Sequence, residues 1–395
     1  MAVLVEDHRL MVLSDHYLTF VKDQVELLAK TFAHTDVYVR YHPATEISRV
    51  FPAPRLKAFR KDSLIDRVNL PENVSIHTVP QFYLPFSHQF RRIGKPYYTK
   101  IKDRITENKA EYDLVHAHFT WPNGFVGAKL KEEYGFPFVI TAHGYDVYDL
   151  PFRDAKWRDL ITGIFDSADA IITVSHRNHE CINQLDIETP VHVLPNGFRS
   201  DLFYARDPVM CRDYLNLPQD KKILLTVANL EPVKGQKYLI EAIGEVVRER
   251  EDVLCIIIGR GRLERTLKRQ IHSLDLADYV ILAGGKPHYE VPLWMNAADL
   301  FVLSSLNEGN PTVMFEALGC GKPFVGTRVG GIPEIITSED YGLLVKPGNV
   351  QDLADILLKA LTKEWDSERI AAYARQYSWG YVVDRIIQVY NDVLY

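Results

Sequence analysis

The chain has 395 residues, of which 47% are hydrophobic and 25% are charged, and its net charge is −6. These values are typical of a soluble globular protein with two domains or slightly more, at about 150 residues per domain. The acidic balance excludes a generally basic nucleic-acid-binding protein, and we expect no nucleic-acid partner.

The chain carries no pattern typical of export or membrane insertion. Its four cysteines have no Cys-x-x-Cys spacing, which indicates reduced thiols and not a disulfide frame or a zinc site. No apolar run approaches the ~18 residues of a membrane span, and Glu6 and Asp7 interrupt any signal-peptide core. We therefore expect a cytoplasmic protein.

Strand-like and helix-like segments alternate through the first half, which predicts an α/β domain with a parallel sheet. The predicted strands are Arg9–Ser14, Val37–Tyr41, Val74–Val79, Leu114–His118, Phe138–Ala142, Ala170–Val174 and Val191–Pro195. The predicted helices are Phe20–Phe32, Leu160–Asp166 and Arg177–Leu185.

Basic side chains gather in residues 49–104 of this otherwise acidic chain. From Phe86 to Lys100 they are interleaved with aromatic residues, a pattern that suits an anionic membrane surface or a phosphate-bearing acceptor. A solvated helix whose long side chains cover a few aromatic rings explains the same pattern. Residues 86–104 therefore have two interpretations, and the first predicts a peripheral protein on the inner face of the membrane.

A linker-like region, Ser200–Asp220, separates the first alternation from a second one. The predicted strands of the second half are Lys222–Ala228, Val253–Ile258, Val280–Ala283, Leu300–Ser304, Phe324–Thr327 and Gly342–Val345. The predicted helices are Gln236–Glu249, Leu263–Ser273, Val291–Ala297, Thr312–Cys320, Pro333–Ile336, Gln351–Leu361 and the amphipathic Trp379–Leu394. Two such halves indicate two doubly wound sheets.

The segment from Glu308 to Glu316 combines a polar loop, a helix start and two carboxylates. Asn310 suits the N-cap of the helix, and Pro311 suits its first helical position. A helix start offers free backbone amides and a positive dipole end to a phosphate. Glu316 lies about 6 Å beyond Thr312 along the axis, at ~1.5 Å per residue, where it could accept hydrogen bonds from ribose hydroxyls. Glu308 would face the group that the nucleotide carries, unless the segment is a plain strand–loop–helix with two solvated acids.

Other polar positions follow predicted strands, where open α/β sheets bind ligands. Lys234 could neutralise a diphosphate that gathers charge as it leaves. Gly259-Arg260-Gly261 lets the backbone approach a ligand, although Glu264 stands where a dinucleotide fingerprint has its third glycine. A single histidine is more often structural, but the position of His143 at the end of a strand favours a functional role.

These motifs resemble the family 4 glycosyltransferases, a retaining, sugar-nucleotide-dependent group with the GT-B fold. Glu308 and Glu316 match the family's pattern of Glu, seven residues and Glu. The resemblance covers nearly all of the chain from about Leu10. It is also carried by the segments His116–His118, His143–Asp146, Leu194–Gly197, Glu316–Thr327, Gly330–Glu334 and Gly342–Val345.

The resemblance implies two Rossmann-like, doubly wound α/β domains that face each other across a cleft. Residues 1–203 would form the acceptor-binding domain, and residues 204–376 the sugar-nucleotide-binding domain. Residues 377–395 would form a helix that packs back on the N-terminal domain.

The resemblance also implies roles for individual residues. The residues implied to be catalytic are His143, which would reach the sugar from the first domain, Glu308, which would grip sugar hydroxyls, and Lys234, which would offset phosphate charge. The residues implied to bind the donor are Asn229, Lys234, Gly259, Gly285, Lys286, Glu308, Gly309, Asn310, Thr312, Val313 and Glu316. Backbone amides near Thr312 and Val313 would hold the diphosphate, Glu316 the ribose, and the backbone at Gly285 and Lys286 the base.

Two positions depart from the family pattern. Asn229 stands where the family often has an arginine, its second phosphate cation, and Arg260 or Arg262 could compensate for the missing charge. The segment Asp15–Phe20 replaces the usual paired-glycine loop after the first strand.

The activity implied is that of a hexosyltransferase of class EC 2.4.1.-, which moves a hexose or N-acetylhexosamine from a UDP- or GDP-sugar to a glycan or a polyprenyl or glycolipid acceptor. The resemblance implies retention by same-face attack, without a cofactor. No Asp-x-Asp occurs in the sequence, which argues against a diphosphate-bound metal. The alternatives are a catalytically idle GT-B scaffold or regulator, and an NAD-dependent oxidoreductase of the same topology.

Overall fold

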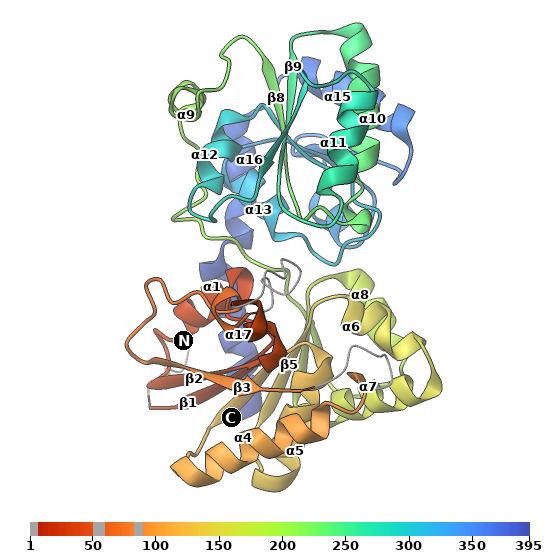
Figure 1. Ribbon diagram of the computed structural model, residues 1–395. Coiled ribbons are helices and arrows are strands. Elements are labelled where there is room, and N and C mark those ends of the chain that lie inside the picture. The colour runs from red at the N-terminus through yellow and green to blue at the C-terminus, as the bar shows by residue number, and fades with distance from the viewer. Residues whose placement is uncertain (1–6, 50–59, 83–89) are drawn as a thin grey trace. The chain divides into compact units, whose positions relative to one another are not determined.

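The computed structural model describes residues 7–49, 60–82 and 90–395, and the chain divides into two compact units (Figure 1). Unit 1 comprises residues 1–195 and 379–395, and unit 2 comprises residues 196–378. The chain therefore leaves unit 1 once and returns to it with its last helix.

Unit 1 is built on a seven-stranded sheet with the order β3-β2-β1-β4-β5-β6-β7, in which all neighbours are parallel. Its strands are β1 (Arg9–Ser14), β2 (His34–Tyr41), β3 (Val74–Pro80), β4 (Leu114–His118), β5 (Phe138–Ala142), β6 (Ala170–Thr173) and β7 (Val191–Val193). Its α-helices are α1 (Thr19–Leu28), α4 (Gly94–Asn108), α5 (Phe125–Tyr134), α6 (Tyr145–Tyr148), α7 (Ala155–Ser167), α8 (His176–Asn183) and α17 (Trp379–Leu394).

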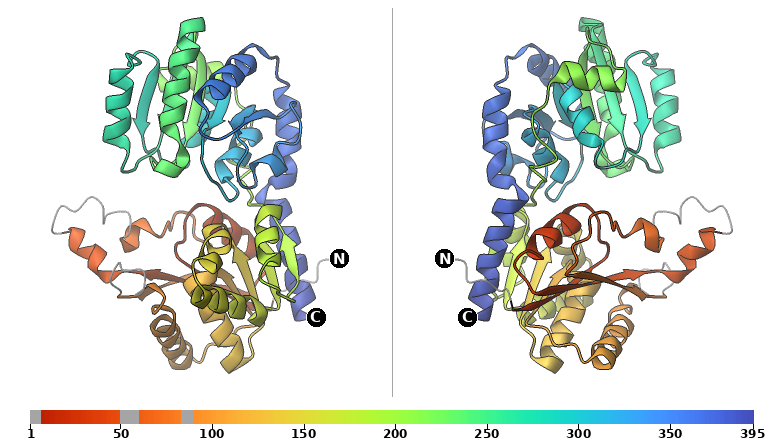
Figure 2. Two further views of the ribbon diagram at one scale, coloured as in Figure 1. Left: turned by 90° about the vertical axis from the view of Figure 1, so that its right-hand side faces the viewer. Right: turned by 90° about the vertical axis from the view of Figure 1, so that its left-hand side faces the viewer.

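Helices cover both faces of this sheet. Successive residues of a strand point to opposite faces, so the apolar residues of each strand pack against helices on both sides. Met11 and Leu13 of β1 join a buried cluster with α4, α5 and α7. Leu10 and Val12 join a second cluster with α1 and α17. The last helix thus packs beside α1, although the two helices lie near opposite ends of the chain (Figure 2).

Unit 2 is built on a six-stranded parallel sheet with the order β10-β9-β8-β11-β12-β13. Its strands are β8 (Lys222–Val227), β9 (Val253–Ile258), β10 (Val280–Gly284), β11 (Leu300–Leu303), β12 (Phe324–Thr327) and β13 (Gly342–Val345). Its α-helices are α9 (Pro208–Leu215), α10 (Gln236–Glu249), α11 (Glu264–Ser273), α12 (Val291–Ala297), α13 (Thr312–Gly319), α14 (Ile332–Ile335), α15 (Val350–Thr362) and α16 (Ser367–Ala374). Two buried clusters, one on each face, form its core.

The structure confirms the predicted fold class of two Rossmann-like α/β units with parallel sheets. Three helices, α5, α6 and α16, were not predicted, and a helix at α4 was only one of the two interpretations of residues 86–104. In α4 the apolar stripe is narrow, since only Tyr97, Ile101 and Ile105 of its large side chains are buried. The helix predicted over Phe20–Phe32 is shorter in the structure: α1 ends at Leu28, and residues 29–33 form turns and a bend before β2.

Candidate functional site

The strand order of unit 2 reverses at β8, which pairs with β9 on one side and with β11 on the other. Ligands of open α/β sheets bind outside the carboxyl ends of the strands at such a point. The loop after β8 carries Lys234 at the end of the 3₁₀ turn Pro232–Lys234, and the loop after β11 carries Glu308. The topology thus brings together two residues that lie 74 positions apart.

An ion pair joins these two loops. Nζ of Lys234 donates to Oε1 and Oε2 of Glu308 at 2.7 and 2.8 Å, and Oγ of Ser305 donates to Oε1 at 2.6 Å. The Glu308 side chain is 7% exposed and that of Lys234 is 25% exposed. A carboxylate this buried needs a partner, because an unpaired charge out of water is strongly unfavourable. The two residues predicted to act on sugar and phosphate are therefore held against each other.

The start of α13 follows directly after Glu308. The backbone N–H groups of Gly309, Asn310, Thr312 and Val313 donate to no acceptor within the described part of the chain. The first amides of a helix have no intrahelical acceptor and carry the positive end of its dipole. The amides predicted to bind the diphosphate and the sugar are thus open to a ligand.

The prediction that Asn310 caps α13 is wrong. The helix begins at Thr312, with Pro311 in the N-cap position and no capping hydrogen bond from a side chain. Oδ1 of Asn310 instead accepts from the backbone N–H of Asn196 at 3.2 Å, and Nδ2 of Asn196 donates to the carbonyl of Asn310 at 3.1 Å. Because Asn196 holds this side chain, the amides of the first turn remain uncapped.

Glu316 lies on α13 with a side chain that is 8% exposed, and its Oε1 is 3.0 Å from Nε2 of His288. His288 lies in the loop between β10 and α12, where its ring centroid is 5.1 Å from that of Phe203. Sequence reasoning missed His288. Its only signal was its place three residues after Gly285, in a loop that was predicted to read the base.

The loop of Glu308 rests on the Gly330–Gly331 turn. Gly330 has a φ of +54°, and a Cβ there would lie 1.9 Å from the carbonyl oxygen of Glu308. The N–H of Gly331 donates to the carbonyl of Gly309 at 2.8 Å. The turn before α14 therefore packs directly against the loop of Glu308. The backbones of the two segments are so close that only glycine fits at position 330.

Gly259 also allows two backbone segments of the protein to lie close together. Its φ is +156°, and a Cβ there would lie 1.9 Å from the carbonyl oxygen of Ala228. The loops after β8 and β9 are further joined by the N–H of Leu230, which donates to the carbonyl of Arg260 at 2.9 Å. The predicted contact of Gly259 with a donor is a separate matter and stays a prediction.

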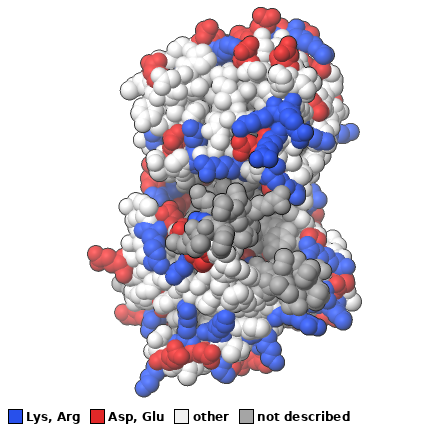
Figure 3. Space-filling model, in the orientation of Figure 1, with Lys and Arg blue, Asp and Glu red and all other residues white. Residues whose placement is uncertain are grey.

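The cationic side chains of this edge follow β9. Asn229 is exposed and uncharged, and Arg262 pairs with Glu231 at 2.7 Å. Arg260 is exposed, packs along Gly285 and forms no ion pair with any residue that the structure describes. Further Lys and Arg side chains gather over α11, the helix that follows (Figure 3). Arg260 is thus the better placed of the two predicted substitutes for the missing arginine.

The side chain of Lys286, in the loop after β10, contacts residues that follow it in the chain. Its Nζ lies 3.6 Å from Oε1 of Glu290 and 4.7 Å from the ring centroid of Trp294. The side chain is thereby directed to α12, which is compatible with the prediction that only the backbone at Gly285 and Lys286 reads a base.

In unit 1 the strand order reverses at β1, which pairs with β2 and β4. His118 ends β4 and His143 follows β5; Nδ1 of His118 and Nε2 of His143 are 3.0 Å apart. Burial holds the pKa of both imidazoles well below 6.5, so both are neutral at pH 7. The sequence suggested His143 as a single functional histidine, but the structure pairs it with His118.

Asp146 fixes the backbone around His143. Its carboxylate accepts from the N–H groups of Gly144 at 2.7 Å, Thr120 at 3.0 Å and His143 at 3.1 Å. Burial raises the pKa of Asp146 to about 6, in opposition to these donors, which favour the charged form. The segment His143–Asp146 is thus a rigid turn joined to the loop after β4.

The loop after β1, which lacks the paired glycines, is tied down by Asp15. Arg40 donates to its two carboxylate oxygens at 2.8 and 3.0 Å, and Nδ2 of Asn123 donates to Oδ1 at 3.1 Å. Side-chain bonds therefore shape this loop, where a glycine pair would have shaped it through the backbone.

Residues 86–89 of the basic, aromatic stretch lie outside the described residues. In the remainder, Arg91 pairs with Asp154 and lies 4.8 Å over the ring of Trp157, while Lys102 pairs with Glu133. Arg92 and Lys95 are exposed. Lys100 and Arg104 also donate to backbone carbonyls, so most of the described cations of this stretch have partners in the protein. This agrees with the interpretation as a helix whose long side chains pack on the protein, and membrane binding stays a prediction.

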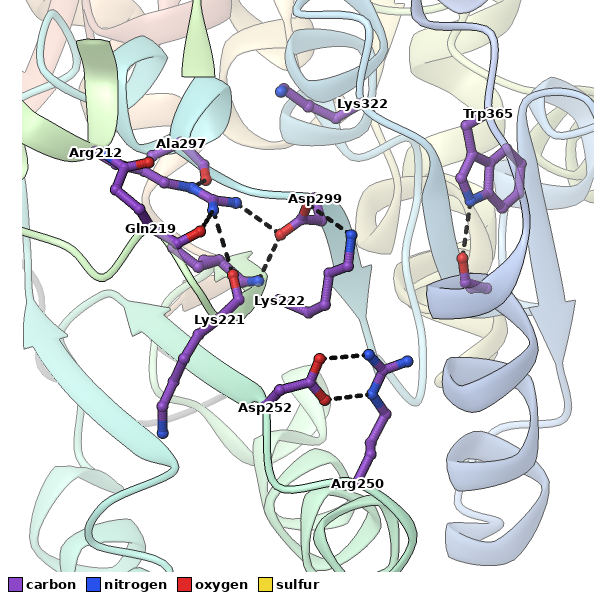
Figure 4. Close-up of polar contacts among 12 residues, drawn as sticks. Arg212, Gln219, Lys221, Lys222, Arg250, Asp252, Ala297, Asp299, Lys322 and Trp365 are labelled. Carbon is purple, nitrogen blue, oxygen red and sulfur yellow. Dashed lines mark hydrogen bonds and ion pairs between the residues drawn. The ribbon is translucent and has the colours of Figure 1, made fainter. Parts of the chain in front are cut away.

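A pocket of about 390 Å³ lies at the opposite edge of the unit 2 sheet, where β8 and β11 begin. Its polar groups already have partners: Arg212 donates to Oδ2 of Asp299 at 2.7 Å, and the N–H of Ile223 donates to the same oxygen at 2.7 Å (Figure 4). This network anchors the ends of the strands.

Within the described ranges 7–49, 60–82 and 90–395, no three or more His, Cys, Asp or Glu side chains are grouped so that they could hold a metal ion. None of their helices combines the length and the apolar character needed to cross a bilayer.

Each of the two units is similar to known proteins. Residues 29–202 match the family model described as Glycosyltransferase Family 4, and residues 212–377 match the model described as Glycosyl transferases group 1. The chain is 29% identical over 331 residues to an uncharacterized glycosyltransferase of Methanocaldococcus jannaschii, covering 82% of this chain and 86% of that protein. It is 28% identical over 313 residues to the N-acetyl-alpha-D-glucosaminyl L-malate synthase of Bacillus anthracis, covering 76% and 80%. Among solved structures it is similar to Anabaena HepE in complex with UDP, with a TM-score of 0.73 at 20% identity over 97% of this chain and 100% of that one.

Proposed function

The chain belongs to the family 4 glycosyltransferases, and from that premise we propose that it moves a hexose or N-acetylhexosamine from a nucleoside diphosphate to a glycan or lipid-linked acceptor. We also propose that transfer retains the anomeric configuration and uses no resident metal or cofactor.

The observation that carries the proposal is the Lys234–Glu308 pair beside the open amides of α13. A cation, a buried acid and a helix start meet at the switch point of one sheet, where a sugar diphosphate needs each of them. The cation and the amides suit the diphosphate, and the acid suits sugar hydroxyls.

The relatives favour a UDP-sugar as the donor. The name of the Bacillus anthracis protein describes transfer of an N-acetylglucosaminyl group, and solved structures of HepE contain UDP and UDP-glucose. Glu316, presented by α13 and already hydrogen-bonded to His288, is the residue that we assign to the ribose.

In the proposed mechanism the acceptor oxygen attacks the anomeric carbon on the face from which the diphosphate leaves. The bond to the phosphate oxygen breaks, the new glycosidic bond forms, and the acceptor's proton passes to the leaving phosphate. Lys234 and the amides of Thr312 and Val313 stabilise the charge of that phosphate. Glu308 and the amides of Gly309 and Asn310 hold the sugar.

Two other functions are compatible with a pair of doubly wound units. Membership of a glycosyltransferase family weighs against the NAD-dependent oxidoreductase, as does Glu264 in place of the third glycine of a dinucleotide motif. An idle scaffold would keep the same fold, so only an activity measurement separates it from an enzyme.

The test is a thermal-shift screen with UDP-, GDP- and ADP-sugars, followed by measurement of donor hydrolysis and transfer. A ligand that binds only the native state raises the apparent stability, so the correct donor raises the melting temperature. We expect UDP-sugars to do so and to be consumed. Binding without turnover by any donor would indicate the scaffold, and no binding at all would contradict the proposal.

We keep peripheral membrane association as a proposal that concerns the exposed Arg92 and Lys95 on the stretch before and within α4. Co-sedimentation with anionic liposomes should then fall in an Arg92→Ala, Lys95→Ala variant. Equal co-sedimentation of both proteins would remove it.

A further inference from the structure

His118 and His143 lie at the carboxyl ends of neighbouring strands, and their rings are parallel within 22° with centroids 5.3 Å apart. Nδ1 of one is 3.0 Å from Nε2 of the other. Because neither atom has another partner in the described residues, one imidazole donates to the other. The two rings thus form a single hydrogen-bonded unit.

The surroundings fix the orientation of the His143 ring. Its centroid is 4.6 Å from that of Phe119 and 4.8 Å from that of Phe20. Phe119 has a φ of +70°, which is rare for a residue with a Cβ and is maintained only where neighbours impose it. A ring packed this way cannot turn freely to exchange its two nitrogens.

The outer nitrogens of the unit have no partner. Nε2 of His118 and Nδ1 of His143 are buried and form no hydrogen bond with any described residue, and the same holds for Nδ1 of His16 and Oδ1 of Asn123. His118 is 0% exposed. Buried polar atoms are nearly always paired in native proteins, so open ones at a strand edge point to a bound ligand.

Proton counting links the two outer nitrogens. Two neutral imidazoles carry two ring protons, and one of these lies in the bond between the rings. The second proton is on Nε2 of His118 or on Nδ1 of His143. The unit therefore always presents one donor and one acceptor, and the tautomer of one ring determines that of the other.

We propose that His118 is a positioning residue that holds Nε2 of His143 in the bond between the rings, so that Nδ1 of His143 binds hydroxyl groups, and not anions, at the carboxyl edge of the unit 1 sheet. A hydroxyl both donates and accepts, so it matches Nδ1 of His143 in either tautomer, whereas neutral rings give no charge to attract a phosphate or a carboxylate. The inference rests on the proposed function for the identity of the ligand as a sugar or an acceptor alcohol.

The test compares His118→Asn with His118→Leu. Asparagine places an amide atom near the position of Nδ1 and can keep the bond to His143, while leucine has similar bulk and no polar atom. Nitrogen-15 NMR of histidine-labelled protein should show a hydrogen-bonded Nε2 of His143 in the wild type and in His118→Asn, and an Nε2 without that bond in His118→Leu. The same hydrogen-bonding state of this Nε2 in the wild type and in His118→Leu would overturn the proposal.

Turnover gives a second readout. We expect kcat to fall at least tenfold in His118→Leu and less than threefold in His118→Asn, while the affinity for UDP changes less than twofold in both. Equal losses in the two variants would contradict a role through the hydrogen bond. The NMR result does not depend on turnover, so loss of the Nε2 hydrogen bond in His118→Leu of an inactive protein would leave this inference standing while the proposed transferase activity fails.

Discussion

At the scale of single residues, a diphosphate bound as proposed would compete with Glu308 for the ammonium group of Lys234. Glu308→Gln keeps the shape of the side chain and an acceptor for Ser305, but it removes the negative charge that now holds Lys234. We expect UDP to bind Glu308→Gln as tightly as the wild type or up to about tenfold more tightly, since breaking the ion pair releases a charge-assisted donor. Turnover should fall at least tenfold.

The matched variant is Glu316→Gln, which removes a charge from the other end of the same segment. A carboxylate that accepts from ribose hydroxyls contributes on the order of 1–3 kcal/mol, so the affinity for UDP should fall about tenfold or more. Calorimetric titration with UDP and initial rates with the UDP-sugar measure both effects. The role assignment fails if Glu308→Gln weakens UDP binding as much as Glu316→Gln does.

The sequence predicted which residues of the candidate site follow strands, but it did not predict their contacts. Lys234 and Glu308 were each predicted from their position after a strand, but their pairing depends on strand order, which periodicity does not reveal. Asn310 was misplaced because its amide bonds to Asn196, a partner 114 positions away. His288 could not be recognised from a lone histidine in a loop.

At the scale of elements, the Gly330 turn and the loop of Glu308 form one unit of structure. Gly330→Ala puts a Cβ 1.9 Å from a backbone oxygen and strains a φ of +54°. We expect a loss of at least ~2 kcal/mol in the free energy of unfolding, from left-handed strain of about 1–2 kcal/mol and the clash. Activity should fall with it, because the loop that presents Glu308 must move.

Gly244→Ala in α10 is the control, since its Cβ would meet only a leucine methyl at 3.7 Å. Alanine is favoured over glycine inside a helix by about 1 kcal/mol, so this variant should be more stable than the wild type. Denaturant titration of both variants measures their free energies of unfolding. Gly330→Ala with wild-type stability would show that the turn adapts and does not support the loop.

Strands were easier to predict than helices for a physical reason. A buried parallel strand is apolar on both faces, and β1, β4, β5, β9, β12 and β13 have the predicted bounds. Helices show only a stripe, and α4, α5 and α16 bury too few large side chains for the 3.6-residue period to stand out. The fold class could be predicted because it depends on the alternation of elements and not on every helix.

At the scale of the whole molecule, unit 1 is completed by the last helix of the chain. Tyr390 of α17 is 0% exposed, and its hydroxyl lies 2.6 Å from Nδ1 of His116, whose Nε2 lies 2.7 Å from Oγ1 of Thr141. The helix thus supplies both apolar packing and a buried polar contact to a sheet that begins near residue 9. The core of unit 2 contains no residue of α17.

This division predicts that the two units unfold in separately assignable steps. Tyr390→Phe leaves a buried imidazole nitrogen unpaired, at a cost of about 1–3 kcal/mol, and should lower the unfolding temperature of unit 1 by about 2–4 °C per kcal/mol. UDP should raise only the unfolding temperature of unit 2, since the proposed donor residues Lys234, Glu308 and Glu316 all belong to it. Scanning calorimetry of the wild type and of Tyr390→Phe, each with and without UDP, measures both shifts. If the substitution and UDP move the same transition, then either α17 does not stabilise unit 1 independently or the nucleotide does not bind where Lys234 and Glu308 meet.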